Sequence, residues 1–207
     1  MSGWQITYRP MMTMQRLIIG ISGASGIQYG IRLLEILRSS PIETHLVMTK
    51  SAQVTLTHET NVRVAEVEAL ADVSYRITDI GAAISSGSFK TVGMIVAPCS
   101  IKSMSEIASG VTDGLLSRAA DVVLKERRRL VLMLRETPLH LGHIRSMAQV
   151  TEMGAIVYPP VPALYARPQS IEEMIDHTLG RVLDLFDLDV GLAKRWSGQR
   201  LSVSDRR

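Results

Sequence analysis

The sequence predicts an α/β domain in which a parallel sheet is covered by helices on both faces. Short apolar runs bounded by polar residues recur along the chain, most clearly at Leu17–Ile21 and Thr91–Ala97. Segments with helical spacing of apolar residues alternate with these runs, as in Ile27–Leu37. Strands buried on both faces are continuous apolar runs, and parallel strands need crossover connections, which are usually helices.

The remaining elements follow the same alternation. Strands are expected at Leu17–Ile21, Glu43–Met48, Thr91–Ala97, Leu130–Leu134 and Ala155–Tyr158. The third of these is expected to end at Pro98, because proline cannot donate to a strand ladder. Helices are expected from Ile27 and over Lys50–Glu59, Glu66–Ala71, Ser100–Ser109, Leu115–Arg127 and His140–Met153.

A stiff loop precedes the last expected helix. Pro159–Pro168 contains four prolines and is expected to carry Tyr165 out over a site. Ser170 then begins a helix, and Glu173 completes a capping box. The apolar face of that helix is expected to comprise Ile171, Ile175, Thr178, Val182 and Phe186, with Arg181 at its margin.

Length and composition indicate one globular domain at 16–190, between tails at 1–15 and 191–207. The chain has 207 residues, of which 46% are hydrophobic and 21% charged, and its net charge of +3 gives no argument for a nucleic-acid partner. Cys99 is the only cysteine, so a reducing compartment and a cytoplasmic location are expected. The sequence contains no run of about 18 apolar residues, so no membrane span is expected.

Polar residues follow the expected strands at four places. They are Ser22–Gly26, Thr49, Pro98–Ser103 and Arg135-Glu136. Because parallel strands end at one edge of a sheet and ligands bind outside that edge, these segments are expected to converge on one site.

The segment Gly23–Gly26 is glycine-rich and opens a helix, which predicts an anion cradle, usually for phosphate. An ordinary tight turn remains an alternative. The glycine spacing is not that of dinucleotide-binding loops, and Thr49 rather than an acidic residue ends the second strand. Both features disfavour an NAD-dependent enzyme.

Other candidate residues have structural alternatives. For Ser100 the alternative is an ordinary helix cap, and for Arg118 and Lys125 it is a solvated helix face. Arg135 could clamp phosphate through its planar fork, and Glu136 could serve as general acid or base. Glu59 is a second carboxylate candidate. The histidines show no metal-ligand spacing with carboxylates, so no metal is expected.

Together these segments resemble the UbiX-type flavin prenyltransferases over Arg16–Trp196. The resemblance rests on GISGASGIQYG, ETHLVMTKSA, ISSGSF, PCSIKSMSEI, RAADVVLKERR, RETPLHLGHIRSM and PPVPALYARPQS. It implies a three-layer, Rossmann-like (flavodoxin-like) subunit in a homododecamer. It also implies FMN as bound substrate and metal-independent transfer of a dimethylallyl group from dimethylallyl phosphate to flavin N5 and C6. The prenylated FMN would serve UbiD-type decarboxylases, in ubiquinone biosynthesis or in aromatic degradation.

The resemblance also implies site residues. For the flavin these are Gly23, Ala24, Ser25, Thr49, Ser100, Ile101, Lys102, Ser103 and Arg135, with Ser25 near the reacting N5. For the dimethylallyl phosphate they are Lys125, Arg135, Tyr165 and Arg181, with Arg118 a weaker candidate. Glu136 is expected to protonate the leaving phosphate, and Glu59 to help remove the proton lost from the flavin ring.

The sequence departs from the family pattern at a few positions, and two alternative functions stand beside the prenyltransferase. Thr49 stands where serine is common in the family and Ser103 where threonine is common, so both positions keep a hydroxyl group. Ile80 stands where some members have tryptophan. One alternative is an FMN-binding accessory or carrier subunit of a hydroxyarylic acid decarboxylase. The other is an enzyme like the flavin-dependent cysteine decarboxylases, although their catalytic histidine and asparagine-rich clamp are not recognised in this sequence.

Overall fold

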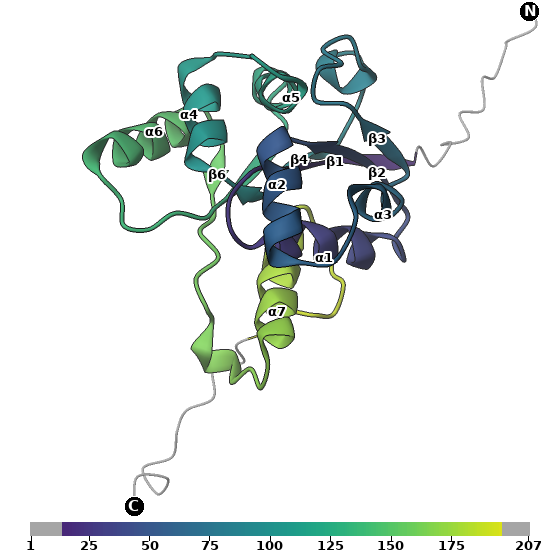
Figure 1. Ribbon diagram of the computed structural model, residues 1–207, viewed down its shortest axis with the longest axis vertical. Helices are drawn as coiled ribbons and strands as arrows, with labels where there is room; N and C mark the ends of the chain where they lie inside the picture. Colours follow the sequence, from purple (N-terminus) through teal and green to yellow (C-terminus); the bar gives the residue numbers. More distant parts are fainter. Residues whose placement is uncertain (1–13, 196–207) are drawn as a thin grey trace, which may run out of the picture.

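The computed structural model describes residues 14–195, which form a six-stranded parallel sheet (Figure 1). The strands are β1 Gln15–Ile21, β2 Ile42–Met48, β3 Val73–Tyr75, β4 Gly93–Cys99, β5 Arg129–Leu134 and β6 Ile156–Val157. Their order is β3-β2-β1-β4-β5-β6, and every neighbouring pair is parallel. The direction of winding therefore reverses between β1 and β4, the position where ligands bind in such sheets.

Helices cover both faces of this sheet, which confirms the predicted fold class. They are α1 Ile27–Leu37, α2 Lys50–Glu59, α3 Val64–Glu68, α4 Ile101–Ser109, α5 Leu115–Lys125, α6 Leu141–Glu152 and α7 Ile171–Asp184, with short 3-10 turns at Ala83–Ser85 and Leu164–Ala166. Figure 1 shows α1 and α7 on one side of the sheet and α4 and α5 on the other.

Two apolar cores follow from the alternation of side chains along the strands. Leu17, Ile19 and Ile21 of β1 pack with residues of α1 and α7, whereas Ile18 packs with residues of α4 and α5. The sheet is thus buried on both faces, which is why its strands are continuous apolar runs.

The fourth strand is longer than predicted, because β4 continues through Pro98 to Cys99. Its pairing with β5 shifts register between Val96 and Cys99. The proline has no N–H to donate, but its carbonyl accepts hydrogen bonds from Ser22, and the Cys99 carbonyl accepts one from Arg135 N at 3.0 Å. The backbone carbonyls of Pro98 and Cys99 therefore keep the end of β4 hydrogen-bonded although the proline has no N–H.

The structure differs from the prediction in two further respects. Strand β3 was not predicted, because its three residues are too few to show a periodicity. Ile171 is 66% exposed and does not belong to the buried face of α7, which contains the predicted Thr178 and Val182 together with His177 and Leu179. The reason is visible in Figure 1, where α7 begins beyond the body of the domain, next to the proline-rich segment 158–170. The expected tails lie largely outside the described residues.

Candidate functional site

A buried serine joins two of the loops at the carboxyl edge of the sheet. Ser22 is fully buried, and its N and Oγ donate to the Pro98 carbonyl at 3.1 and 3.0 Å. The Ser22 Oγ also accepts a hydrogen bond of 2.7 Å from Ser100 N. The loop that carries Gly23 to Ser25 is therefore held against the turn that opens α4. Ser22 was not among the predicted site residues.

The other two predicted segments reach the same edge. Thr49 N donates to the Ile21 carbonyl at 3.0 Å, so the start of α2 lies beside the end of β1. Arg135 N donates to the Cys99 carbonyl at 3.0 Å, which places the end of β5 beside that of β4. The structure thus brings all four predicted segments together.

The glycine-rich loop packs tightly on α2. A Cβ atom added at Gly23 would collide with the side chain of Ser51. Glycine is required here because only a residue without a side chain allows this close approach. The loop and α2 therefore form one continuous surface beside Ser25.

The N-terminus of α1 is already occupied by a carboxylate of this chain. Glu59 Oε2 accepts hydrogen bonds of 2.9 Å from both Gly26 N and Ile27 N. Burial acts to raise the pKa of Glu59, but hydrogen bonds from Ser25, Ile27 and Gly26 and the charge of Arg135 lower it overall. The helix terminus expected to hold phosphate therefore holds Glu59 in its ionised form, beside Ser25.

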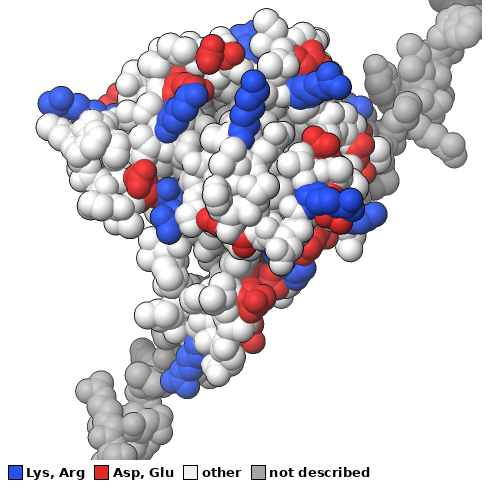
Figure 2. Space-filling view, in the orientation of Figure 1, with Lys and Arg blue, Asp and Glu red and all other residues white. Residues whose placement is uncertain are grey.

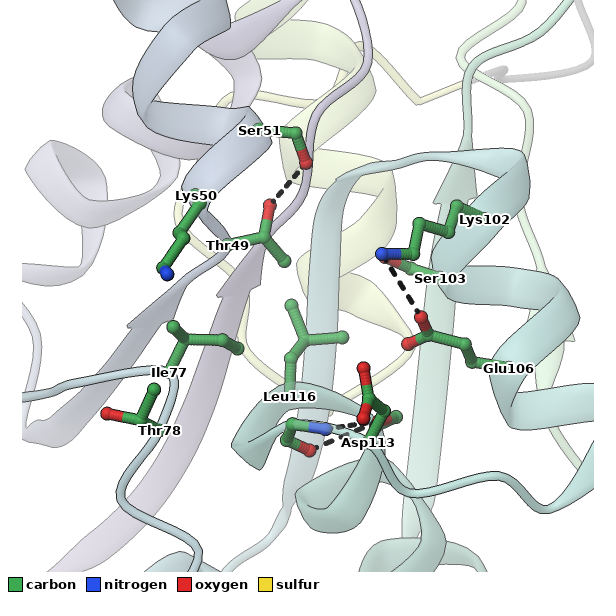
Figure 3. A pocket seen from close by; sticks show the side chains of 12 residues that line it. Thr49, Lys50, Ser51, Ile77, Thr78, Lys102, Ser103, Glu106, Asp113 and Leu116 are labelled. Atoms are coloured by element: carbon green, nitrogen blue, oxygen red, sulfur yellow. Dashed lines mark hydrogen bonds and ion pairs between the residues drawn. The ribbon is translucent and has the colours of Figure 1, made fainter.

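A cavity of about 440 Å³ lies beside the starts of α2, α4 and α5 (Figure 3). Its lining residues are Thr49, Lys50, Ser51, Ile77, Thr78, Lys102, Ser103, Glu106, Asp113, Gly114, Leu116 and Ser117. Three of these, Thr49, Lys102 and Ser103, are predicted flavin-site residues. Figure 3 shows Lys102 reaching Glu106, and their charged atoms are 3.6 Å apart.

Helix N-termini surround this cavity. Thr49 caps α2, its Oγ1 accepting from Ala52 N at 3.1 Å, and Gly114 is the cap residue of α5. Ser100 caps α4, with its Oγ 3.2 Å from Ser103 N. The remaining N–H groups of these first turns and the positive ends of the helix dipoles favour an anion. Because Glu59 fills the terminus of α1, the N-termini of α2, α4 and α5 are alternative positions for a phosphate, and Glu106 and Asp113 also line this cavity.

A second group of predicted residues gathers around two tyrosines, Tyr29 and Tyr158. Burial raises the pKa of Tyr29, and the charge of Arg135 and a hydrogen bond with Thr178 oppose this rise. Burial also raises the pKa of Tyr158, with Arg181 opposing and Tyr165 adding to the rise. Arg135, Tyr165 and Arg181 therefore lie around one half-buried aromatic cluster. Neither central tyrosine was predicted, because each lies in a segment interpreted simply as a helix or strand.

Lys125 does not join this group within one chain. It lies at the end of α5, where its Nζ is 2.6 Å from Glu126 Oε1 and close to Gly87. From there the chain enters β5, whose six residues lead to Arg135. Six residues of strand span about 20 Å. Lys125 and Arg135 therefore lie at opposite edges of the sheet.

Of the other residues singled out in the sequence, Glu136 and Ile80 are exposed, Arg118 is partly exposed and Cys99 is buried. Arg118 forms an ion pair of 2.7 Å with Asp121, which was not predicted. Glu136 is exposed, and its Oε1 accepts a hydrogen bond from Thr137 N at 3.0 Å. Ile80 is 63% exposed. Cys99 is fully buried, and burial raises the pKa of its thiol to about 12, which excludes a nucleophilic role.

Two features are absent from residues 14–195. That region contains no group of three or more His, Cys, Asp or Glu side chains able to hold a metal ion. It also contains no helix that is both long and apolar enough to cross a membrane.

On the face shown in Figure 2, lysines and arginines are interspersed with acidic residues, and no extended area of one sign is present.

Comparison with known proteins agrees with this geometry. A family model described as Flavoprotein matches residues 5–185. The flavin prenyltransferase UbiX of Escherichia coli K12 is 59% identical over 188 residues, which cover 89% of this chain and all of that protein. This chain belongs to the UbiX flavin prenyltransferases of the flavoprotein family. The probable UbiX-like flavin prenyltransferase of Bacillus subtilis is 53% identical and is matched over 90% of its length.

Solved structures support the same family. AnUbiX (PadA1) in complex with FMN and dimethylallyl pyrophosphate superposes with a TM-score of 0.89 at 51% identity, covering 91% of this chain and all of that one. A dodecameric FMN-dependent Ubix-like decarboxylase from Escherichia coli O157:H7 gives 0.87 at 48% identity, covering 89% and 100%. The cysteine decarboxylase TvaF gives 0.58 at 19% identity, covering 75% and 96%, which shows a shared fold alone.

Proposed function

We propose that this protein is a flavin prenyltransferase that joins the dimethylallyl group of an allylic phosphate to N5 and C6 of reduced FMN. The observation that supports this most directly is that Glu59 interacts with both Ser25 and Arg135, at the edge of the sheet where the four predicted segments meet. The product is prenylated FMN, supplied to a UbiD-type decarboxylase. The single buried cysteine is consistent with a cytoplasmic location.

The flavin is proposed to bind across the carboxyl edge of the sheet. Its phosphate would enter the cavity at the N-termini of α2 and α4, where Thr49, Ser100 and Ser103 supply hydroxyl groups. Lys102 and Ile101 would complete this side of the site. The ring system would then extend along Gly23 to Ser25 toward Arg135. Reduced flavin supplies the nucleophilic N5 and C6 atoms when bound.

Glu59 is proposed to accept the proton that the flavin ring loses. Its carboxylate is kept ionised by the hydrogen bonds at the α1 N-terminus, and Ser25 connects it to the proposed position of N5. A base must be unprotonated at the start of the reaction, and the lowered pKa of Glu59 meets this requirement at neutral pH.

The departing phosphate is proposed to be held by Arg135, Tyr165 and Arg181. Loss of phosphate from an allylic carbon leaves a cation, and without a metal the departing anion must be stabilised by positive side chains. Glu136 would donate a proton to this group. Within the chain Glu136 is exposed, so the water-excluded site that an allylic cation requires must be completed by other surfaces.

A neighbouring subunit is proposed to complete the site. Lys125 lies at the opposite edge of the sheet from Arg135, so it reaches a phosphate bound at Arg135 only from another copy of the chain. Exposed apolar residues, Leu139, Leu141, Ile144, Val161 and Leu164, lie on α6, the segment before it and the proline-rich segment. Burial of these residues would stabilise an assembly, and a relative forms a dodecamer.

The direct test uses mass spectrometry. The purified protein is incubated anaerobically with reduced FMN and either dimethylallyl phosphate or dimethylallyl pyrophosphate, and the extracted flavin is analysed. A flavin that gains the mass of one dimethylallyl group supports the proposal, and the two donors show which phosphate is used. If the protein binds FMN but gives no adduct with either donor, the carrier function becomes the better explanation.

A further inference from the structure

A buried histidine stands behind Tyr165 and has no role in the chemistry above. His177 lies on α7 and is 5% exposed. Its Nε2 lies 3.3 Å from the Tyr165 hydroxyl oxygen, and the two rings meet edge to face with centroids 5.6 Å apart. Within the described residues its other nitrogen, Nδ1, is buried without a hydrogen-bond partner.

These surroundings determine which nitrogen carries the proton. With the proton on Nδ1, a buried N–H donor would have no acceptor, which is costly. With the proton on Nε2, the ring donates to Tyr165, and only a lone pair on Nδ1 stays unpaired. The second arrangement is favoured, so His177 is the donor and the Tyr165 oxygen the acceptor. The hydroxyl hydrogen of Tyr165 is then directed away from His177.

The two residues differ in how firmly they are held. Tyr165 lies on the 3-10 turn of the proline-rich segment and is 54% exposed. His177 lies on a helix tied to α1 by Arg32, whose guanidinium donates to Asp176 at 2.7 and 3.0 Å. The histidine is therefore the fixed partner, and the tyrosine is the one whose orientation depends on it.

We propose that His177 is a positioning residue, which sets the Tyr165 hydroxyl to donate its hydrogen bond to the phosphate of the allylic substrate. The inference rests on the proposed function, since it assumes that Tyr165 contacts this phosphate. His177 itself touches neither substrate. Its effect is to remove from substrate binding the cost of orienting a hydroxyl on an exposed turn.

The experiment uses a pair of amide substitutions at one position. In His177→Gln the side-chain nitrogen can take the place of Nε2, whereas in His177→Asn the shorter side chain places it near the position of Nδ1, out of reach of Tyr165. Both are compared with Tyr165→Phe and with the double variant H177N/Y165F. For each protein we would measure thermal stability, FMN affinity, and kcat and KM for the allylic phosphate.

Loss of one hydrogen bond predicts that Tyr165→Phe and His177→Asn each raise KM for the allylic phosphate by about threefold to tenfold, with FMN affinity unchanged. His177→Gln is expected to retain the wild-type KM. The double variant is expected to be no worse than the poorer single variant, because both changes remove the same interaction.

Three outcomes would overturn the inference while leaving the proposed function intact. The first is that Tyr165→Phe raises KM but His177→Asn does not. The second is that the double variant multiplies the two effects, so that the residues act independently. The third is that Gln and Asn at 177 lower thermal stability and raise KM equally, in which case His177 has only a packing role. If no variant, wild type included, prenylates FMN, the proposed function itself fails.

Discussion

The hydrogen bonds of Glu59 at the start of α1 lead to a prediction about stability. The substitution Glu59→Gln keeps the size of the side chain but removes its charge and one of its two acceptor oxygens. In the wild type the carboxylate accepts from Gly26 N and Ile27 N and interacts with Ser25. In the variant an NH₂ group must face one of these donors or turn away from them.

The size of the effect follows from these contacts. A hydrogen bond to a charged group contributes about 1.5–3 kcal/mol, and a charge at a helix N-terminus a further 0.3–1 kcal/mol or so. Glutamine keeps one acceptor, and the site is partly open to solvent, so only part of this stabilising free energy is lost. We expect the free energy of unfolding to fall by about 2 kcal/mol at pH 7.

The pH dependence gives an independent check. The pKa of Glu59 is lower in the folded chain than in the unfolded one. Its contribution to stability is therefore fully present above the unfolded pKa of about 4.3 and is lost as the pH falls through the lower folded value. The difference between wild type and Glu59→Gln should thus be constant from neutral pH down to about pH 5 and shrink at more acidic pH.

Urea denaturation at several pH values measures this difference. Protein concentration must be held constant, because subunit association contributes to apparent stability. Glu68→Gln, at an exposed carboxylate on α3, is the matched control and is expected to leave the midpoint unchanged. A Glu59→Gln protein as stable as the wild type at pH 7 would refute the anchoring role. A deficit that persists unchanged at acidic pH would show that size or packing, rather than charge, is responsible.

Three further predictions concern binding and catalysis. Ser22→Ala removes the two side-chain hydrogen bonds of Ser22, to the Pro98 carbonyl and from Ser100 N, and keeps the bond from its backbone N. FMN affinity, measured by fluorescence titration, should therefore fall by about tenfold; unchanged affinity would mean that the loops hold their positions without the two side-chain bonds. Glu136→Gln should bind FMN normally but prenylate it about 100-fold more slowly, as seen in single-turnover assays, and wild-type rates would remove Glu136 from the mechanism. Lys125→Ala and Arg135→Ala should each be inactive, but subunits of the two, dissociated and reassembled together, should regain activity if each site combines residues from two chains. No recovery in confirmed mixed assemblies would argue that Lys125 acts elsewhere.

The alternation of apolar runs and helical segments was sufficient to predict most of the architecture. The bounds of α2 agree with prediction, and the four loops expected at one edge do meet there. These features are local: burial on both faces determines the composition of a strand, and parallel strands place their ends at one edge. The three-residue strand β3 and the passage of β4 through Pro98 depend on neighbouring strands, and so were not predicted.

The sequence by itself determined the fold, the family and the chemical types of the site residues, because these depend on periodicity and on motifs that are contiguous in the chain. Only the tertiary structure showed that Glu59 occupies the N-terminus of α1, that Ser22 joins two loops and that His177 supports Tyr165. It alone separated Lys125 from Arg135. Each of these relations depends on how segments distant in the sequence are placed in space. Such a relation leaves no periodic pattern in the sequence from which it could be predicted.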